Sequence, residues 1–308
     1  SQLGLTPVAQ LDTYHGLVFA TLDAGAPGLA EYLGDMAWYL DILLDRYEGG
    51  TELIGSVQKW PVRANWKFPA ENFISDFQHA QTMTHVSAMK AQGFYAVQPA
   101  TDGVQMSTGG GHGLFIIRRD QIQAPLPSPV VDPVVLDWLR SAREASKRRL
   151  GELRGSGVLD VVSGTVFPNF SFLMQVIFPS LRVWQPRGPE EIEIWSWCIV
   201  PRSAPAEVKD WMRLSYQRNF GPGGMFEQDD AETWQHATAV NRGFATRQGW
   251  LSVGMGLGHE ERDEQMPGLK GRLISESNAR TFLRRWKDLI AAESWSEVPV
   301  RLQPLDRV

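Results

Sequence analysis

The chain has 308 residues, of which 43% are hydrophobic and 10% aromatic, and it carries a formal net charge of −5. This length supports one large hydrophobic core or two modest ones. The net charge is negative and the basic residues are scattered, which argues against nucleic acid as the main partner. No apolar run approaches a membrane-spanning length, and the N-terminus lacks the basic start and apolar stretch of a signal peptide, so we expect a cytoplasmic protein without a membrane partner.

Apolar periodicity and turn residues predict helices and strands along the whole chain. In the first half we expect strand over 8–23, helix over 29–46, strand over 53–66, helix over 71–89, strand over 104–119 with a glycine-rich interruption at 109–113, and a proline-rich surface loop or lid over 125–133. In the second half we expect helix over 137–154, three strands within 167–200, helices over 204–219 and 227–242 with a tight turn at 220–224, strand over 249–255, and a closing helix over 277–293 capped by Ser277 or Asn278.

The order of these elements indicates the fold class. Long helices alternate with runs of antiparallel strands, which is typical of an α+β fold. We find no repeat, low-complexity segment or linker, so residues 1–308 are interpreted as a single domain.

Cysteine usage limits the chemistry of the chain. Cys198 is the only cysteine, which excludes a disulfide within these residues, a four-cysteine zinc site and an iron–sulfur cluster held by this chain alone. It stands in the apolar, strand-like run 194–200, and we interpret it as a buried thiol without a chemical role.

A cluster of metal-ligand residue types lies in the segment 65–85. His79 and His85 follow Asp76 with the pattern D-x-x-H-x₅-H, and a second acidic cluster ends far downstream at Asp230. Two histidines and one carboxylate form the ligand set of non-haem Fe(II) oxygenases, which leaves coordination positions open. Asp229, beside Asp230, is interpreted as an acid that favours the helix dipole.

The spacing of the two histidines does not fit a straight helix. Asp76 and His79 share a helix face, but His79 and His85 are about 120° apart at 100° per residue. Either the helix is distorted between them, for example by a π-bulge, or His85 lies beyond its end.

Several segments, in order along essentially the whole chain, resemble the α subunit of Rieske ring-hydroxylating dioxygenases, such as naphthalene and biphenyl dioxygenases. The spacing between the two histidines resembles the biphenyl-type branch. The matching segments are Asn65-Trp-Lys, Glu71-Asn-Phe-x-x-Asp-x-x-His79 with His85, Phe167-Pro-Asn-x-Ser-Phe, Asn219-Phe-Gly-Pro-x-Gly and Phe226-Glu-Gln-Asp-Asp230.

This resemblance implies roles for the clustered residues. His79, His85 and Asp230 become the iron ligands, and Asp76 becomes the catalytic-site carboxylate that connects a ligand histidine to the Rieske cluster of a neighbouring subunit. The family's N-terminal Rieske domain has no counterpart in these residues, so the [2Fe–2S] cluster is expected from a partner chain or a missing domain. The chain is then a fragment or a protein encoded separately from its Rieske partner.

The residues that flank the ligands have two interpretations. They line a substrate pocket, or they only pack the core. The pocket candidates are Asn72, Phe73, Phe77, Ala80, Asn219, Phe220 and Phe226.

The resemblance further implies a helix-grip fold, in which helices wrap a large antiparallel sheet and enclose an apolar cavity. It implies cis-dihydroxylation of an aromatic compound with O₂, Fe(II), a Rieske or ferredoxin electron donor, and a homo-oligomer, a trimer that can include a small β subunit. No Arg or Lys stands within 71–85 or 219–230, which favours a neutral hydrocarbon over a benzoate.

Two other functions remain open from the sequence. One is a decayed homologue that binds hydrophobic ligands without catalysis. The other is a 2-oxoglutarate oxygenase, but those proteins place His-x-Asp before a distant His on a jelly roll, whereas here the two histidines come first.

Overall fold

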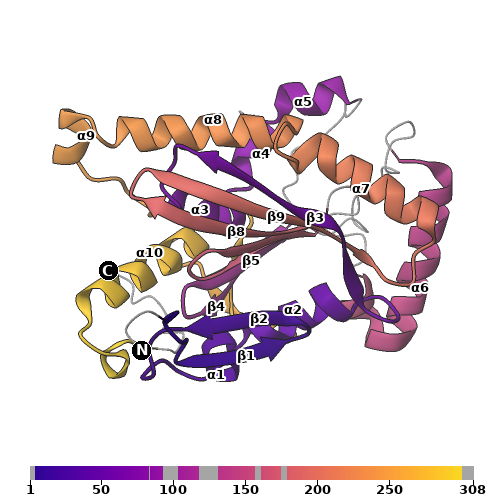
Figure 1. Ribbon diagram of the computed structural model, residues 1–308, viewed down its shortest axis with the longest axis horizontal. Helices are drawn as coiled ribbons and strands as arrows, with labels where there is room; N and C mark the ends of the chain where they lie inside the picture. The colour runs from indigo at the N-terminus through magenta and orange to yellow at the C-terminus, as the bar shows by residue number, and fades with distance from the viewer. Residues whose placement is uncertain are drawn as a thin grey trace.

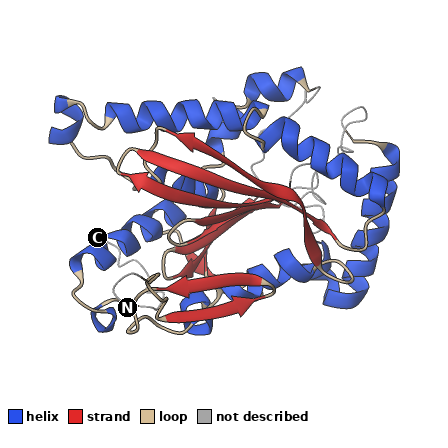
Figure 2. Cartoon of the chain, in the orientation of Figure 1, coloured by secondary structure: helices blue, strands red, loops and turns tan. Residues whose placement is uncertain are grey.

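An antiparallel sheet covered by helices on both faces forms the centre of the protein (Figures 1 and 2). The computed structural model describes residues 4–82, 84–92, 103–117, 131–156, 161–174 and 179–299. Within these, the strands are β1 (Gln10–Tyr14), β2 (Leu17–Thr21), β3 (Thr51–Val62), β4 (Gly103–Gly109), β5 (His112–Ile117), β6 (Val161–Val166), β7 (Phe170–Met174), β8 (Ser180–Gly188), β9 (Glu191–Pro201), β10 (Glu261–Arg262) and β11 (Leu269–Arg272). The helices are α1 (Leu29–Leu33), α2 (Met36–Asp45), α3 (Lys67–Ser75), α4 (Gln78–Thr82), α5 (Val86–Ala91), α6 (Pro133–Gly155), α7 (Ala206–Phe220), α8 (Met225–Val240), α9 (Phe244–Gln248) and α10 (Ser277–Ala291), followed by a 3₁₀ turn (Trp295–Glu297).

The strand order in the large sheet is β10-β11-β4-β5-β6-β7-β8-β9-β3, and every neighbouring pair is antiparallel. The hairpin of β1 and β2 forms a sheet of its own. The alternation of side chains along a strand assigns residues to the two faces: in β5, Leu114 and Ile116 join the core on one face, while Phe115 and Ile117 join a cluster on the other. The sheet therefore separates two apolar layers.

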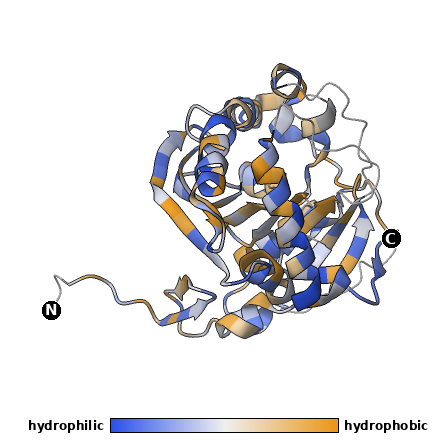
Figure 3. Cartoon of the chain, turned by 90° about the vertical axis from the view of Figure 1, so that its right-hand side faces the viewer, coloured by the Kyte–Doolittle hydropathy of each residue, from blue (hydrophilic) through white to orange (hydrophobic). Residues whose placement is uncertain are grey.

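The first layer lies between the sheet and α3, α7, α8 and α10, and it contains Phe73, Trp184, Phe226, Trp234 and Phe282. The second lies on the opposite face under α1, α2 and the β1–β2 hairpin. Figure 3 shows apolar and hydrophilic positions mixed around the covering helices, as expected of helices with one buried face. The predicted α+β class, an antiparallel sheet wrapped by helices, is confirmed. No helix among the described residues combines the length and hydropathy that crossing a bilayer requires.

Two predicted helices are interrupted. The helix expected over 29–46 divides at Gly34, whose φ of 48° lies outside the helical region, into α1 and α2. The helix expected over 71–89 is three helices, because the backbone leaves helical geometry at Asp76 (φ −91°, ψ 74°) and again before His85. These interruptions decide where the ligand candidates point.

Other sequence expectations were wrong or incomplete. Residues 249–255 form no strand, although their apolar residues alternate, because Trp250 and Leu251 are exposed and no described strand pairs with this segment. The cap of α10 is Glu276 without a side-chain hydrogen bond, since Ser277 and Asn278 turn inward to Gln105, Ile74 and Leu114. Strands β6, β10 and β11 were not predicted, and most of the expected loop over 125–133 lies outside the described residues. The buried thiol at Cys198 is confirmed.

Candidate metal centre

Three ligand-type atoms converge beneath α8. His79 lies in α4, His85 is the residue before α5, and Asp230 lies in the second turn of α8. The Nε2 atoms of the two histidines are 3.3 Å apart, and each is 3.3 Å from Oδ1 of Asp230. These three residues form a group that could hold a metal ion.

The break in the predicted helix makes this convergence possible. α3 ends at Ser75, Asp76 adopts a non-helical conformation, and the chain restarts in the short helix α4. His85 then lies beyond the end of α4, which is the second of the two alternatives left open by the spacing. The imidazole of His79 and that of His85 meet at a ring separation of 4.9 Å.

The distances fit a small divalent cation. Three atoms that are mutually 3.3 Å apart share points about 2 Å from each of them, which matches the bonds of imidazole nitrogen and carboxylate oxygen to a first-row metal. Oδ1 of Asp230 is buried without a hydrogen bond of good geometry. A buried charged oxygen without such a bond is costly, and a cation between the three atoms would satisfy it.

The electrostatics of the site also favour a cation. Burial raises the pKa of the Asp230 carboxyl, but the charge of His85 and the close approach of both imidazoles outweigh it and hold that pKa below its usual range. Burial lowers the pKa of His79, and the carboxylates of Asp230 and Asp76 overcome this and raise it to about 10. The carboxylates thus draw positive charge into the centre, and a metal ion would compete with the proton on His79.

The second ring nitrogen of each histidine has its own partner. Nδ1 of His79 lies against the backbone carbonyl of Asp76 and 3.6 Å from its carboxylate, and Nδ1 of His85 is 3.3 Å from Oδ2 of Asp229. Such partners fix the tautomer that leaves Nε2 free for a metal. The contact of Asp229 was missed in the sequence, where this residue was interpreted only as a helix-dipole acid, because it depends on the placement of α8 over α5.

The pocket candidates lie in different places. Phe226 is next to the centre, with its ring 4.6 Å from that of His85, and the amide of Asn72 is 3.1 Å from Nδ1 of His79. Phe220 packs on Phe226 at 5.7 Å.

The remaining candidates make other contacts. Phe73 packs on Trp184 in the first layer, and Phe77 packs on Phe115 in a separate small cluster. Asn219 is buried and accepts a hydrogen bond from Gln92, and Ala80 is half-buried. A role of all seven in substrate binding stays a prediction.

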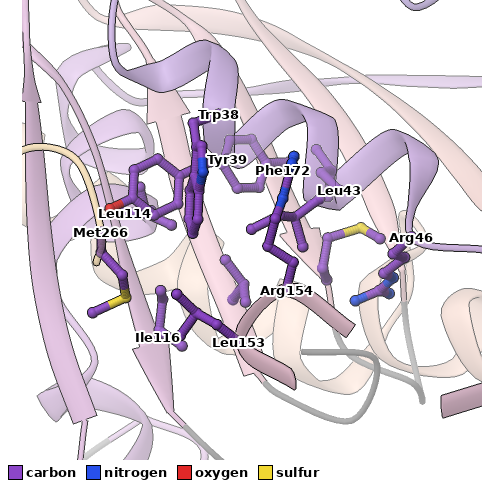
Figure 4. Close-up of a pocket in the computed structure, with 13 residues that line it drawn as sticks. Trp38, Tyr39, Leu43, Arg46, Leu114, Ile116, Leu153, Arg154, Phe172 and Met266 are labelled. Carbon is purple, nitrogen blue, oxygen red and sulfur yellow. The ribbon is translucent and has the colours of Figure 1, made fainter. Parts of the chain in front are cut away.

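A cavity of about 50 Å³ lies on the opposite face of the sheet, between α2 and the C-terminal part of α6 (Figure 4). No ligand candidate and no pocket candidate lines it. Its walls are Trp38, Tyr39, Ile42, Leu43, Arg46, Leu114, Ile116, Leu153, Arg154, Val162, Phe172, Met174 and Met266. This cavity is therefore separate from the candidate metal centre.

Two histidines and a carboxylate that converge over an antiparallel sheet have the residue types and spacing of a 2-His-1-carboxylate metal site, which is a class of site shared by many oxygenases. Residues 29–292 match the family described as ring hydroxylating alpha subunit (catalytic domain), and the chain belongs to this family. Membership of this family removes the 2-oxoglutarate oxygenase alternative.

Individual relatives agree with the family. The α subunit of biphenyl 2,3-dioxygenase from Rhodococcus jostii (strain RHA1) is 38% identical over 297 residues, which cover 94% of this chain and 64% of the relative. A structure of naphthalene 1,2-dioxygenase from Rhodococcus sp. bound to indole superposes with a TM-score of 0.80 at 37% identity, covering 94% of this chain and 68% of that one. A second structure of naphthalene 1,2-dioxygenase, with indole in its active site, superposes with a TM-score of 0.85 at 30% identity. The match covers 96% of this chain and 67% of that one. The chain thus spans just under two thirds of the length of the first of these relatives.

Proposed function

We propose that this chain carries the mononuclear Fe(II) centre of an aromatic ring-hydroxylating dioxygenase, with His79, His85 and Asp230 as the iron ligands. The observation that supports it most is the mutual 3.3 Å separation of three ligand atoms, one of them a buried carboxylate oxygen without a good hydrogen bond. Relatives named for biphenyl, benzene and naphthalene support an aromatic hydrocarbon as the substrate class.

The reaction joins one aromatic ring, one O₂, two electrons and two protons into a cis-dihydrodiol. Fe(II), when bound, supplies the site at which O₂ is reduced. The residues of the chain hold and orient the reactants: Asp229 and Asp76 fix the two imidazoles, and Phe226 with Phe220 provides an apolar wall beside His85. Holding the ring in one orientation supplies much of the rate in such reactions.

The remaining components come from outside these 308 residues. Electrons come from a Rieske [2Fe–2S] centre supplied by a ferredoxin-linked partner or domain, because one cysteine cannot hold such a cluster. We propose a homo-oligomer, a trimer with or without a small β subunit, in which Asp76 lies on the electron path. Its half-exposed carboxylate, 39% accessible beside His79, suits a contact with a second subunit.

The test is the iron content after anaerobic reconstitution with Fe(II). We expect one iron per wild-type chain and loss of most of it in His79→Ala and in Asp230→Ala, with the fold retained by circular dichroism. His236→Ala is the matched control, because His236 is an exposed histidine of α8 outside the ligand group. Full iron in both ligand variants would contradict the ligand set. Product formed from naphthalene or biphenyl and O₂ when a reduced Rieske partner supplies the two electrons separates the enzyme from a non-catalytic binder, which would give none.

A further inference from the structure

A fully buried ion pair lies close to the candidate metal centre and has no part in the scheme above. Arg182 of β8 and Glu227 in the first turn of α8 have no exposed side-chain surface, and Nη1 of Arg182 is 2.5 Å from Oε2 of Glu227. The other carboxylate oxygen of Glu227 is buried without a hydrogen-bond partner. A buried pair with an oxygen left unsatisfied is poorly explained by stability, because desolvation offsets most of the attraction.

The same arginine also reaches the preceding helix. Its Nη2 donates a hydrogen bond of 2.9 Å to the carbonyl of Phe220, the last residue of α7. Its guanidinium carbon lies 5.1 Å from the ring centre of Phe220 and 5.4 Å from that of Phe73. One side chain from the sheet therefore contacts both the end of α7 and the start of α8.

The turn between these helices delivers a ligand to the centre. Glu227 and Asp230 are three residues apart and share a face of α8, so a contact that fixes Glu227 also fixes the rotation of Asp230 about the helix axis. The turn itself is tight, because a Cβ on Gly224 would lie 2.4 Å from the carbonyl oxygen of Asn219. Phe226, whose ring packs on His85, belongs to the same first turn.

We propose that Arg182 and Glu227 are positioning residues of the metal centre. Their ion pair clamps the end of α7 and the start of α8 to β8, and it thereby sets the place of Asp230 and Phe226. Ligand sites lose affinity when the groups that hold their ligands are released, typically by tenfold to a hundredfold. This inference rests on the proposed function, since it assumes a metal bound by Asp230 and the two histidines.

The test replaces the pair by apolar side chains of similar volume in the double variant Arg182→Met/Glu227→Met. Removing both charges avoids the buried unpaired charge that either single substitution would leave. The apo-protein should therefore keep a thermal midpoint near that of the wild type. Its dissociation constant for Co(II), read from the visible absorption of the bound metal, should rise by about tenfold to a hundredfold.

An ion pair within the β8–β9 hairpin is the matched control. Arg187 and Glu193 join β8 to β9 at 2.6 Å, but their side chains are 51% and 26% exposed, and the further hydrogen bond of Glu193 comes from Trp195 of the same hairpin. Arg187→Met/Glu193→Met should leave the Co(II) dissociation constant unchanged. A rise of the same size in this control would show a general loosening of the sheet and would overturn the positioning role.

A folded double variant that binds Co(II) like the wild type would also overturn it. If that variant does not fold, Arg182→Lys decides, because lysine keeps the charge but cannot bridge Glu227 and the carbonyl of Phe220 together. We expect weaker Co(II) binding in Arg182→Lys. Co(II) binding as tight as that of the wild type would contradict the positioning role of Arg182 and Glu227. Absence of Co(II) binding in the wild-type chain would instead overturn the proposed function on which this inference depends.

Discussion

Gln105 of β4 is the buried side chain whose loss we expect to destabilise the protein most. Its side chain is fully buried, and its Nε2 lies within 3.0 Å of the backbone carbonyl oxygens of Ser75, Leu273 and Ser275. Its Oε1 accepts a hydrogen bond of 3.2 Å from the backbone N–H of Asn278. One amide thus joins the end of α3, the loop after β11 and the start of α10.

Substitution of Gln105 by leucine keeps most of the volume and removes every one of these hydrogen bonds. Each buried polar group that loses its partner costs about 1–3 kcal/mol. Because at least two groups lose a partner deep in the core, we expect the free energy of unfolding to fall by about 4 kcal/mol. A loss of this size belongs to the extreme end of single substitutions.

Urea denaturation followed by tryptophan fluorescence measures this difference. The matched control is Ser107→Ala, two residues along the same strand, where a buried hydroxyl makes a hydrogen bond of 3.1 Å to Thr281. The free energy of unfolding of that variant should be lower than that of the wild type by about 1 kcal/mol. If Gln105→Leu lies within about 1 kcal/mol of the wild type, or costs no more than the control, the reasoning about the buried amide is refuted.

Three further outcomes are expected. Phe226→Ala should keep its iron yet shift the ratio of products from a bicyclic arene, because its ring lies 4.6 Å from that of the proposed ligand His85. An unchanged product ratio would contradict a place for Phe226 in the substrate pocket. Burial raises the pKa of the Cys198 thiol to about 12, so a disulfide reagent at pH 8 should label it only after unfolding, and rapid labelling of the native protein would contradict this. Asp76→Asn should keep its iron and still react once when a soluble reductant supplies both electrons, but it should lose repeated turnover with a Rieske partner; full turnover would show that Asp76 is only a surface acid.

The sequence predicted the long elements well, because their periodicity reflects burial on one face. α7, α8 and α10 begin and end within about two residues of the expected limits. The breaks in the segment 71–89 could not be predicted, because neither Gly nor Pro stands between Glu71 and Met89. The end of α3 depends on contacts with distant strands, such as the hydrogen bond from Ser163 to the carbonyl of Phe73.

The ligand candidates His79, His85 and Asp230 came from the resemblance to the family, because residue types and spacing alone did not single them out. Neither the pattern nor the resemblance indicated that Asp229 contacts the outer ring nitrogen of His85. Asp229 reaches His85 across 144 positions of sequence, and only the placement of α8 creates that contact. The Arg182–Glu227 ion pair could not be predicted either, since nothing in the sequence around either residue indicates that its charged side chain is buried.

The two outer strands of the sheet affect how copies of this chain can associate. An outer strand offers unpaired backbone groups to any other extended chain, and proteins limit this with short strands, charges and bulges. Within the described residues, β10 is the pair Glu261–Arg262, two exposed charged residues, and β3 carries a shift of register between Ile54 and Gln58 with Gly55 at a φ of 74°. β10 is too short, and β3, although 12 residues long, is interrupted by this irregularity, so neither strand is a flat template. The outer strands therefore disfavour edge-to-edge strand pairing between molecules. We expect assembly of this protein to use its helices and loops.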